Sequence, residues 1–256
     1  MKNRRVALIT GAAGGLGQAL TRDLASRGYE LALTDLAAPH ALPSDAFFID
    51  GDLSELSFVE RVVDRVVAQC GRIDLLVNAA AWRELLTLRT ITPQSFEKTL
   101  RIGLTAPAFL ARSAAAHMER QQRGVIVNVS SIMADRASGI APAYVAAKGG
   151  LDALTRDLAV LYGRSGVRAV GVAPGAFDGP TSHDYGPADQ ALKTYSEQMI
   201  PLGRWATADE VARVIGWLAS DEAAYISGTT VVIDGGWTAS LYPRNISAQI
   251  MPTEFT

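Results

Sequence analysis

Cysteine is almost absent from the sequence: Cys70 is the only one among 256 residues. A single cysteine excludes an internal disulfide and any cysteine-rich metal site. The three histidines, His40, His117 and His183, are scattered, and none has a partner at the spacing of a metal-binding motif. We therefore expect no bound metal.

Long apolar runs and an excess of one charge are also missing. No apolar run approaches the ~20 residues that a membrane-spanning helix needs. Lys2, Arg4 and Arg5 precede an apolar run, but this run ends at Gly11 after a few residues, which favours a first strand over a signal peptide. The 24 basic and 26 acidic residues nearly balance, without a basic stripe. We expect a cytoplasmic protein that binds neither nucleic acid nor membrane.

Short apolar runs alternate with amphipathic helical patterns along the whole chain. This alternation predicts an α/β fold, in which a doubly wound parallel sheet carries helices on both faces. Strands are expected at 5–10, 29–34, 46–49, 73–77, 125–129, 167–173 and 230–233. Helices are expected after the loop 11–17, at 54–69, at 93–121 with a kink at Pro107, from Pro142 and at 207–220. Residues 176–203 are expected to be less regular. Without a linker or repeat, residues 1–256 are predicted to form a single domain.

Three polar residues follow the predicted strand 125–129. Ser131 comes just after the strand, and Tyr144 and Lys148 are four residues apart on the helix that begins at Pro142, so they share a helix face. A hydroxyl, a phenol and an ammonium can therefore converge on one small volume. The alternative is a partly exposed helical pair without a catalytic role.

The predicted chemistry of this group is the movement of a proton on and off an oxygen. A free phenol titrates near ~10, and a neighbouring ammonium lowers that pKa, so we expect Lys148 to lower the pKa of Tyr144. Tyr144 can then give a proton to a carbonyl or take one from an alcohol. Ser131 can donate a hydrogen bond to the same oxygen.

A glycine-rich loop lies between the first predicted strand and the helix that follows it. Gly11, Gly15 and Gly17 form the pattern Gly-x-x-x-Gly-x-Gly. Glycine lets a backbone approach a pyrophosphate closely, and a helix N-terminus adds N–H donors and a favourable dipole. The pattern predicts a dinucleotide site, with a simple tight turn as the alternative.

Asp35 comes at the end of the second predicted strand. An acid at this place can accept hydrogen bonds from the adenosine ribose hydroxyls and repels a 2′-phosphate. Because the glycine loop contains no Lys or Arg, we expect NAD as the cofactor, with NADP less favoured. The alternative is an aspartate that only caps the loop.

These residues and their order resemble the short-chain dehydrogenase/reductase family along nearly the whole chain. The resemblance rests on the following motifs: Thr10-Gly11-x-x-x-Gly15-x-Gly17, Asp52-Leu53, Asn78-Ala79-Ala80-Ala81, Ser131 thirteen residues before Tyr144, Tyr144-x-x-x-Lys148, Pro174-Gly175, Pro201-Leu-Gly-Arg204, Asp209-Glu-Val-Ala212 and Asp234-Gly-Gly236. The resemblance implies a Rossmann-like fold.

The resemblance also implies roles for individual residues. Ser131, Tyr144 and Lys148 would be catalytic, with Lys148 also bonding the nicotinamide ribose. The implied cofactor-binding residues are Gly11, Gly15, Leu16, Gly17, Asp35, Asp52, Leu53, Asn78, Ala79, Tyr144, Lys148, Pro174, Gly175 and Phe177. Residues 176–203 would form a substrate lid, and the protein would be a homo-oligomer, a dimer or tetramer.

The sequence departs from the family pattern at three places. Gly103 replaces the asparagine that the family places in the long helix, and Ala79 and Ala81 alter the turn after the fourth strand. Gly179 takes the usual place of a threonine after Pro-Gly, and Thr181 lies two residues on.

The sequence and the resemblance predict an NAD-dependent oxidoreductase that interconverts a secondary alcohol and its ketone. A sugar, a polyol or another small hydroxy compound is the expected substrate. Arg83 follows the fourth strand near the expected substrate mouth, where it would bind a carboxylate or hydroxyls together with Ser131 and Tyr144; the alternative is an exposed loop arginine. The alternative functions are a 3-oxoacyl-carrier-protein-type ketone reductase and a catalytically weak nucleotide-binding sensor or scaffold.

The C-terminal tail, residues 237–256, is rich in apolar side chains for a chain end. It contains Trp237, Leu241, Tyr242, Ile246, Ile250, Met251 and Phe255. Because chain ends usually fray unless something holds them, we expect this tail to pack against a neighbouring subunit.

Overall fold

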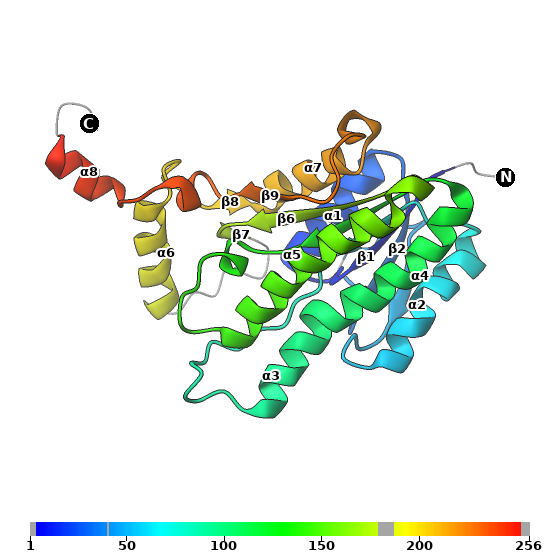
Figure 1. Ribbon diagram of the computed structural model, residues 1–256, viewed down its shortest axis with the longest axis horizontal. Helices are drawn as coiled ribbons and strands as arrows, with labels where there is room; N and C mark the ends of the chain where they lie inside the picture. Colours follow the sequence, from blue (N-terminus) through cyan, green and yellow to red (C-terminus); the bar gives the residue numbers. More distant parts are fainter. Residues whose placement is uncertain (1–3, 40, 179–186, 252–256) are drawn as a thin grey trace.

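A seven-stranded sheet forms the centre of the computed structural model, which describes residues 4–39, 41–178 and 187–251 (Figure 1). The strand order is β3-β2-β1-β4-β5-β6-β9. The strands are β1 (Val6–Thr10), β2 (Glu30–Asp35), β3 (Phe47–Asp50), β4 (Leu75–Asn78), β5 (Gly124–Val129), β6 (Val167–Pro174) and β9 (Thr230–Ile233). All neighbouring pairs are parallel, so every strand ends at the same edge of the sheet. The predicted doubly wound α/β fold is confirmed.

Helices cover both faces of this sheet. Alternate residues of β1 enter two different cores: Ala7 and Ile9 face one, Val6 and Leu8 the other. The first core is closed by α1 (Gly15–Ser26) and α7 (Ala208–Leu218), and the second by α2 (Leu56–Cys70), α4 (Ala106–Gln121) and α5 (Pro142–Tyr162). Because both faces are buried, the central strands are apolar along their whole length.

The long helix predicted at 93–121 is divided in three. It consists of α3 (Pro93–Leu100), a π-helical turn at Arg101–Thr105 and α4. Pro107 has no N–H to donate to the carbonyl of Gly103, four residues earlier, and the Ala106 N–H bonds the carbonyl of Arg101, five residues earlier. The predicted irregularity therefore exists, but it occupies the turn before Pro107.

The described parts of the stretch 176–203 are more regular than expected. It includes β7 (Phe177–Asp178), which pairs with β8 (Ala206–Thr207), and α6 (Pro187–Met199). Gly179 and Thr181 lie outside the described residues. The last helix, α8 (Arg244–Ile250), lies beside α6 at the end of the molecule opposite the N-terminus (Figure 1). Across the part of the chain described here, no helix is long and apolar enough to cross a membrane.

Candidate active site

Ser131, Tyr144 and Lys148 converge at the carboxyl edge of the sheet. Ser131 follows the end of β5, and its Oγ accepts the N–H of Met133 at 3.1 Å, which fixes the short turn after the strand. Tyr144 lies in the first turn of α5, one turn before Lys148. The Ser131 hydroxyl lies near enough to the phenol of Tyr144 to lower its pKa. The structure thus brings together the three groups that the sequence predicted to meet.

Lys148 is buried, with only 2% of its surface exposed. Its Nζ donates to the carbonyl of Val129 at 2.6 Å and lies 5.4 Å from the centroid of the Tyr144 ring. Burial lowers the pKa of Lys148 to about 8, against an opposing effect of Asp152. The amine therefore carries its charge at neutral pH and loses it as the pH rises through about 8.

The predicted effect of Lys148 on the Tyr144 phenol is wrong in this structure. Burial raises the pKa of Tyr144 above its ordinary value, and this rise is opposed first by the Arg83 cation and then by the Ser131 hydroxyl. The guanidinium carbon of Arg83 lies 5.4 Å from the centroid of the Tyr144 ring. The ammonium of Lys148 is instead engaged by the Val129 carbonyl.

The glycine loop presents an uncapped helix N-terminus. Helix α1 begins at Gly15, and its N-cap residue Gly14 has no side chain to satisfy the first N–H groups. Gly11 has φ +70°, and a Cβ on Gly17 would lie 2.1 Å from the carbonyl oxygen of Gly11. The loop is thus folded so tightly that only glycine fits, and free N–H groups with the positive end of the helix dipole suit a pyrophosphate.

Asp35 at the end of β2 caps this loop. Its Oδ2 accepts the N–H of Ala13 at 2.9 Å and its Oδ1 accepts the N–H of Leu36 at 2.7 Å. The loop-capping interpretation therefore describes one role of Asp35. Each carboxylate oxygen can accept more than one hydrogen bond, so the same side chain can also receive ribose hydroxyls beside the glycine loop.

The altered turn after β4 is held by Thr10, a residue of the glycine motif to which the sequence analysis gave no role of its own. The Thr10 hydroxyl accepts the N–H groups of Ala79 at 3.0 Å and Ala80 at 3.1 Å. The donors are main-chain N–H groups, so the alanines that replace the family's side chains at 79 and 81 leave the turn supported. Asn78, the first residue of the turn motif, donates to Asn128 at 2.9 Å inside the sheet.

The remaining predicted cofactor residues lie along the same edge. Leu53, 9% exposed, follows Asp52, whose carboxylate accepts the N–H of Ser54 at 2.7 Å. Pro174 ends β6, and a Cβ on Gly175 would lie 2.9 Å from the Cβ of Asp234. Phe177 begins β7 and packs on the core that α1 and α7 close.

Gly103 lies buried in the π-helical turn against α5. A Cβ added there would lie 3.1 Å from the Cβ of Ala147, the residue before Lys148. Glycine therefore permits the close approach of this turn to the helix that carries Tyr144 and Lys148.

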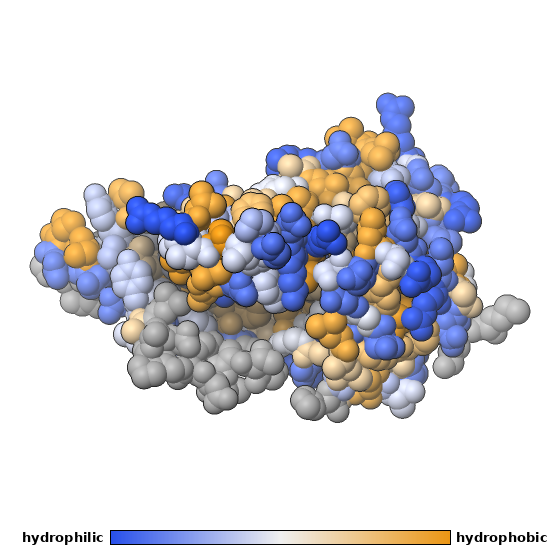
Figure 2. All heavy atoms as spheres, turned by 90° about the horizontal axis from the view of Figure 1, so that it is seen from below, coloured by the Kyte–Doolittle hydropathy of each residue, from blue (hydrophilic) through white to orange (hydrophobic). Residues whose placement is uncertain are grey.

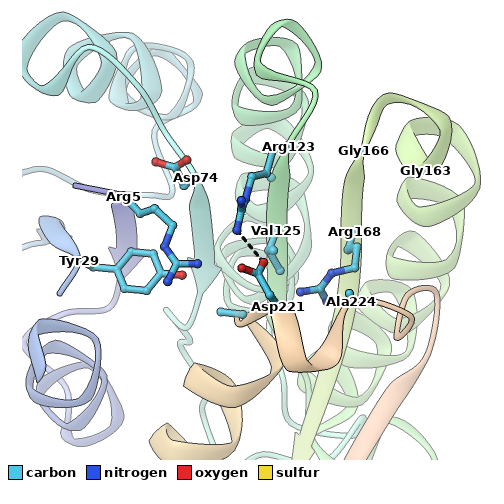
Figure 3. Close-up of a pocket in the computed structure, with 12 residues that line it drawn as sticks. Arg5, Tyr29, Asp74, Arg123, Val125, Gly163, Gly166, Arg168, Asp221 and Ala224 are labelled. Atoms are coloured by element: carbon cyan, nitrogen blue, oxygen red, sulfur yellow. Dashed lines mark hydrogen bonds and ion pairs between the residues drawn. The ribbon is translucent and has the colours of Figure 1, made fainter. Parts of the chain in front are cut away.

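A separate cavity of about 370 Å³ lies at the opposite edge, where the strands begin (Figure 3). Its charged groups are largely engaged with one another and with the backbone. Arg123 pairs with Asp221 at 2.6 Å, Arg168 donates to the carbonyls of residues 218, 220 and 226, and Arg5 lies 4.9 Å from the centroid of the Tyr29 ring. None of the predicted site residues lines this cavity. In the described ranges, no three His, Cys, Asp or Glu side chains are grouped as metal ligands.

Comparison with known proteins places this site in a family. The profile described as enoyl-(acyl carrier protein) reductase matches residues 11–238. The chain belongs to the short-chain dehydrogenase/reductase family. It is therefore a dehydrogenase or reductase that acts on CH–OH groups and their ketones with NAD or NADP, and the resemblance predicted from the motifs is confirmed.

Two similar proteins illustrate the range of the family. The chain is 36% identical to cis-4-hydroxycyclohexanecarboxylate dehydrogenase of Sinomonas cyclohexanicum over 92% of this chain and 97% of that one. It is also 36% identical to D-threitol dehydrogenase of Mycolicibacterium smegmatis over 91% of this chain and 93% of that one.

Two solved structures share the fold over nearly their whole length. A 4-hydroxyisoleucine dehydrogenase complexed with NADH has a TM-score of 0.86 at 26% identity, covering 93% of this chain and 100% of the other. A gluconate 5-dehydrogenase from Burkholderia cenocepacia in complex with NADP and tartrate has a TM-score of 0.85 at 29% identity, covering 93% and 96%.

Proposed function

We propose that this chain interconverts a secondary alcohol of a small hydroxy compound and the corresponding ketone with NAD, and that Tyr144 is the acid and base. The observation that carries this proposal is the convergence of Ser131, Tyr144 and Lys148 at one point of the carboxyl edge. The uncapped N-terminus of α1 lies at the same edge and suits a dinucleotide.

The protein side chains supply the proton chemistry. When bound, the nicotinamide group supplies or accepts the hydride. During reduction, the Tyr144 hydroxyl donates its proton to the carbonyl oxygen, while Ser131 donates a hydrogen bond that stabilises the charge developing there. The guanidinium of Arg83 favours the phenolate that remains, because it opposes the rise in the pKa of Tyr144 that burial causes. During oxidation, the Tyr144 phenolate takes the proton from the alcohol.

Asp35 supports NAD over NADP in this proposal. Its carboxylate is held beside the glycine loop by the N–H of Ala13, where a 2′-phosphate would meet a negative charge. Similar structures carry NADH in one case and NADP in another, so this preference depends on Asp35 itself.

The substrate class is narrower than secondary alcohols in general. The names of similar proteins include hydroxy acids and polyols, and Arg83 beside Tyr144 suits either. We propose that residues 176–203 act as the substrate lid and that the protein works as a homo-oligomer, as the family resemblance implies.

The test is turnover with NAD and NADP side by side on secondary alcohols, ketones and acyl-carrier ketones. Tyr144→Phe should abolish turnover while the cofactor still binds, measured by quenching of protein fluorescence or by calorimetry. A wild-type protein that binds cofactor but turns over no compound in either direction would support the sensor or scaffold alternative instead. Preference for acyl-carrier ketones and NADPH would support the ketone reductase.

A further inference from the structure

Arg83 is a cation at the candidate active site that no carboxylate neutralises among the described residues. Its guanidinium carbon lies 5.4 Å from the centroid of the Tyr144 ring, and its Nη1 lies 4.0 Å from the Sδ of Met133. The adjacent acid, Glu84, accepts a hydrogen bond from the Ser95 hydroxyl at 2.6 Å. The guanidinium therefore stands beside the reacting phenol with hydrogen-bond donors to spare.

We propose that the physiological substrate is a small hydroxy carboxylic acid, or the oxo acid in the reverse direction, and that Arg83 binds its carboxylate. This inference rests on the function proposed above and names the substrate class of that site. The reacting hydroxyl would lie at Tyr144 and Ser131, and the carboxylate at the guanidinium.

The chemistry of Arg83 favours a carboxylate over the hydroxyls of a polyol. A guanidinium presents a planar fork of N–H donors that matches the two oxygens of a carboxylate, and hydrogen bonds between charged partners are shorter and stronger than neutral ones. Hydroxyls would satisfy some of these donors but leave the positive charge without a partner.

The other cations near the site are less suited to this role. Lys148 is buried and donates to the Val129 carbonyl at 2.6 Å, so its charge is held in the interior. The Nζ of Lys98 lies 4.5 Å from the centroid of the ring of Trp82, the residue that precedes Arg83. Lys98 therefore adds positive potential near Arg83. Arg83 and Lys148 both lie 5.4 Å from the centroid of the Tyr144 ring, but only Arg83 of these two is exposed.

The experiment compares acids with their uncharged counterparts. Hydroxy acids with the hydroxyl on the third, fourth or fifth carbon are each assayed beside their methyl ester, with D-threitol as a neutral polyol. The proteins are the wild type, Arg83→Gln, Arg83→Lys and, as a control on the same loop, Arg89→Gln. Both cofactors are present in excess in separate series.

We expect kcat/KM of the wild type to be about 10- to 100-fold higher for the acid than for its ester, the range that a charged hydrogen bond supplies. Arg83→Gln should remove this preference mainly by raising KM for the acid, so that the acid and its ester are used about equally at the same pH. Arg83→Lys should retain part of the preference, and Arg89→Gln all of it.

Three results would overturn the inference while the proposed function stands: equal use of acid and ester, a preference for the polyol, or an acid preference that survives in Arg83→Gln. Absence of turnover with every compound and both cofactors would instead overturn the proposed function, and this inference with it.

Discussion

The guanidinium carbon of Arg83 lies 5.4 Å from the centroid of the Tyr144 ring. Burial raises the pKa of this phenol, and Arg83 lowers it. Alcohol oxidation needs the phenolate, so its rate should rise with pH through the pKa of Tyr144. Arg83→Gln removes a lowering influence, and the rise should therefore move to higher pH. The measurement is kcat/KM for an uncharged secondary alcohol as a function of pH.

The shift of the pH profile in Arg83→Gln can be assigned to the Tyr144 phenol. The pKa of Lys148, about 8, is set by burial and Asp152, so Arg83→Gln should leave that titration in place. Arg89→Gln makes the same charge change on the same loop and should not move the profile. An unchanged profile in Arg83→Gln would show that Arg83 does not tune the phenol.

Asp35 supports a prediction on cofactor choice. Asp35→Ala should weaken the binding of NAD and improve the relative use of NADP, because the negative charge beside the 2′ position of the ribose is removed. The alanine also removes the acceptor for the Ala13 N–H, which loosens the glycine loop. The measurement is the ratio of kcat/KM for the two cofactors.

Asp35→Asn separates these two effects. Asparagine keeps a side-chain oxygen that can accept the Ala13 N–H, but it carries no charge. We expect it to shift the ratio toward NADP with a smaller loss of thermal stability than Asp35→Ala. If the wild type already uses NADPH much better than NADH, the assignment of NAD is wrong.

The sequence predicted those parts of the fold and site that depend on local pattern. The alternation of strands and helices fixed the architecture, and the rule that parallel strands end at one edge brought Ser131 near Tyr144 and Lys148. The contacts it missed join segments far apart in the chain. The support of the turn by Thr10, the effect of Arg83 on the pKa of Tyr144 and the π-helical turn before Pro107 all depend on tertiary packing, which no local pattern records.

The C-terminal tail supports a prediction on assembly. Leu241, Ile250 and Met251 are 81%, 63% and 49% exposed, and apolar atoms are visible at this end of the molecule (Figure 2). Phe255, also part of the predicted apolar set, lies outside the described residues. Burying such side chains against a second copy would stabilise an oligomer.

Deletion of the residues after Tyr242 should therefore weaken assembly. We expect light scattering to show a smaller species, or a larger dissociation constant between subunits. The control is the full-length chain with Arg244→Gln, which changes an exposed charge on the same segment. An unchanged oligomer after deletion would refute the proposed interface.

Gly103 supports the last prediction, on the turn beside Lys148. The family resemblance implies that the asparagine expected here helps to bind a water, which links Lys148 to solvent. The backbone carbonyl at the helix irregularity would bind the same water. Glycine has the same backbone carbonyl. Because Pro107 has no N–H, it cannot donate to the Gly103 carbonyl as residue i+4 of an ordinary α-helix would. We therefore expect the proton pathway to work in the natural protein.

Gly103→Asn should change turnover by roughly tenfold or less, since about 1.4 kcal/mol is the most that a better-ordered water supplies. The new Cβ would lie 3.1 Å from the Cβ of Ala147, so α5 must shift slightly and the melting temperature should fall. In an Ala147→Gly background, the same substitution should cost less stability, because the contact is relieved. If Gly103→Asn instead creates activity in a protein that had none, the natural chain is a nucleotide-binding sensor and the enzymatic proposal fails.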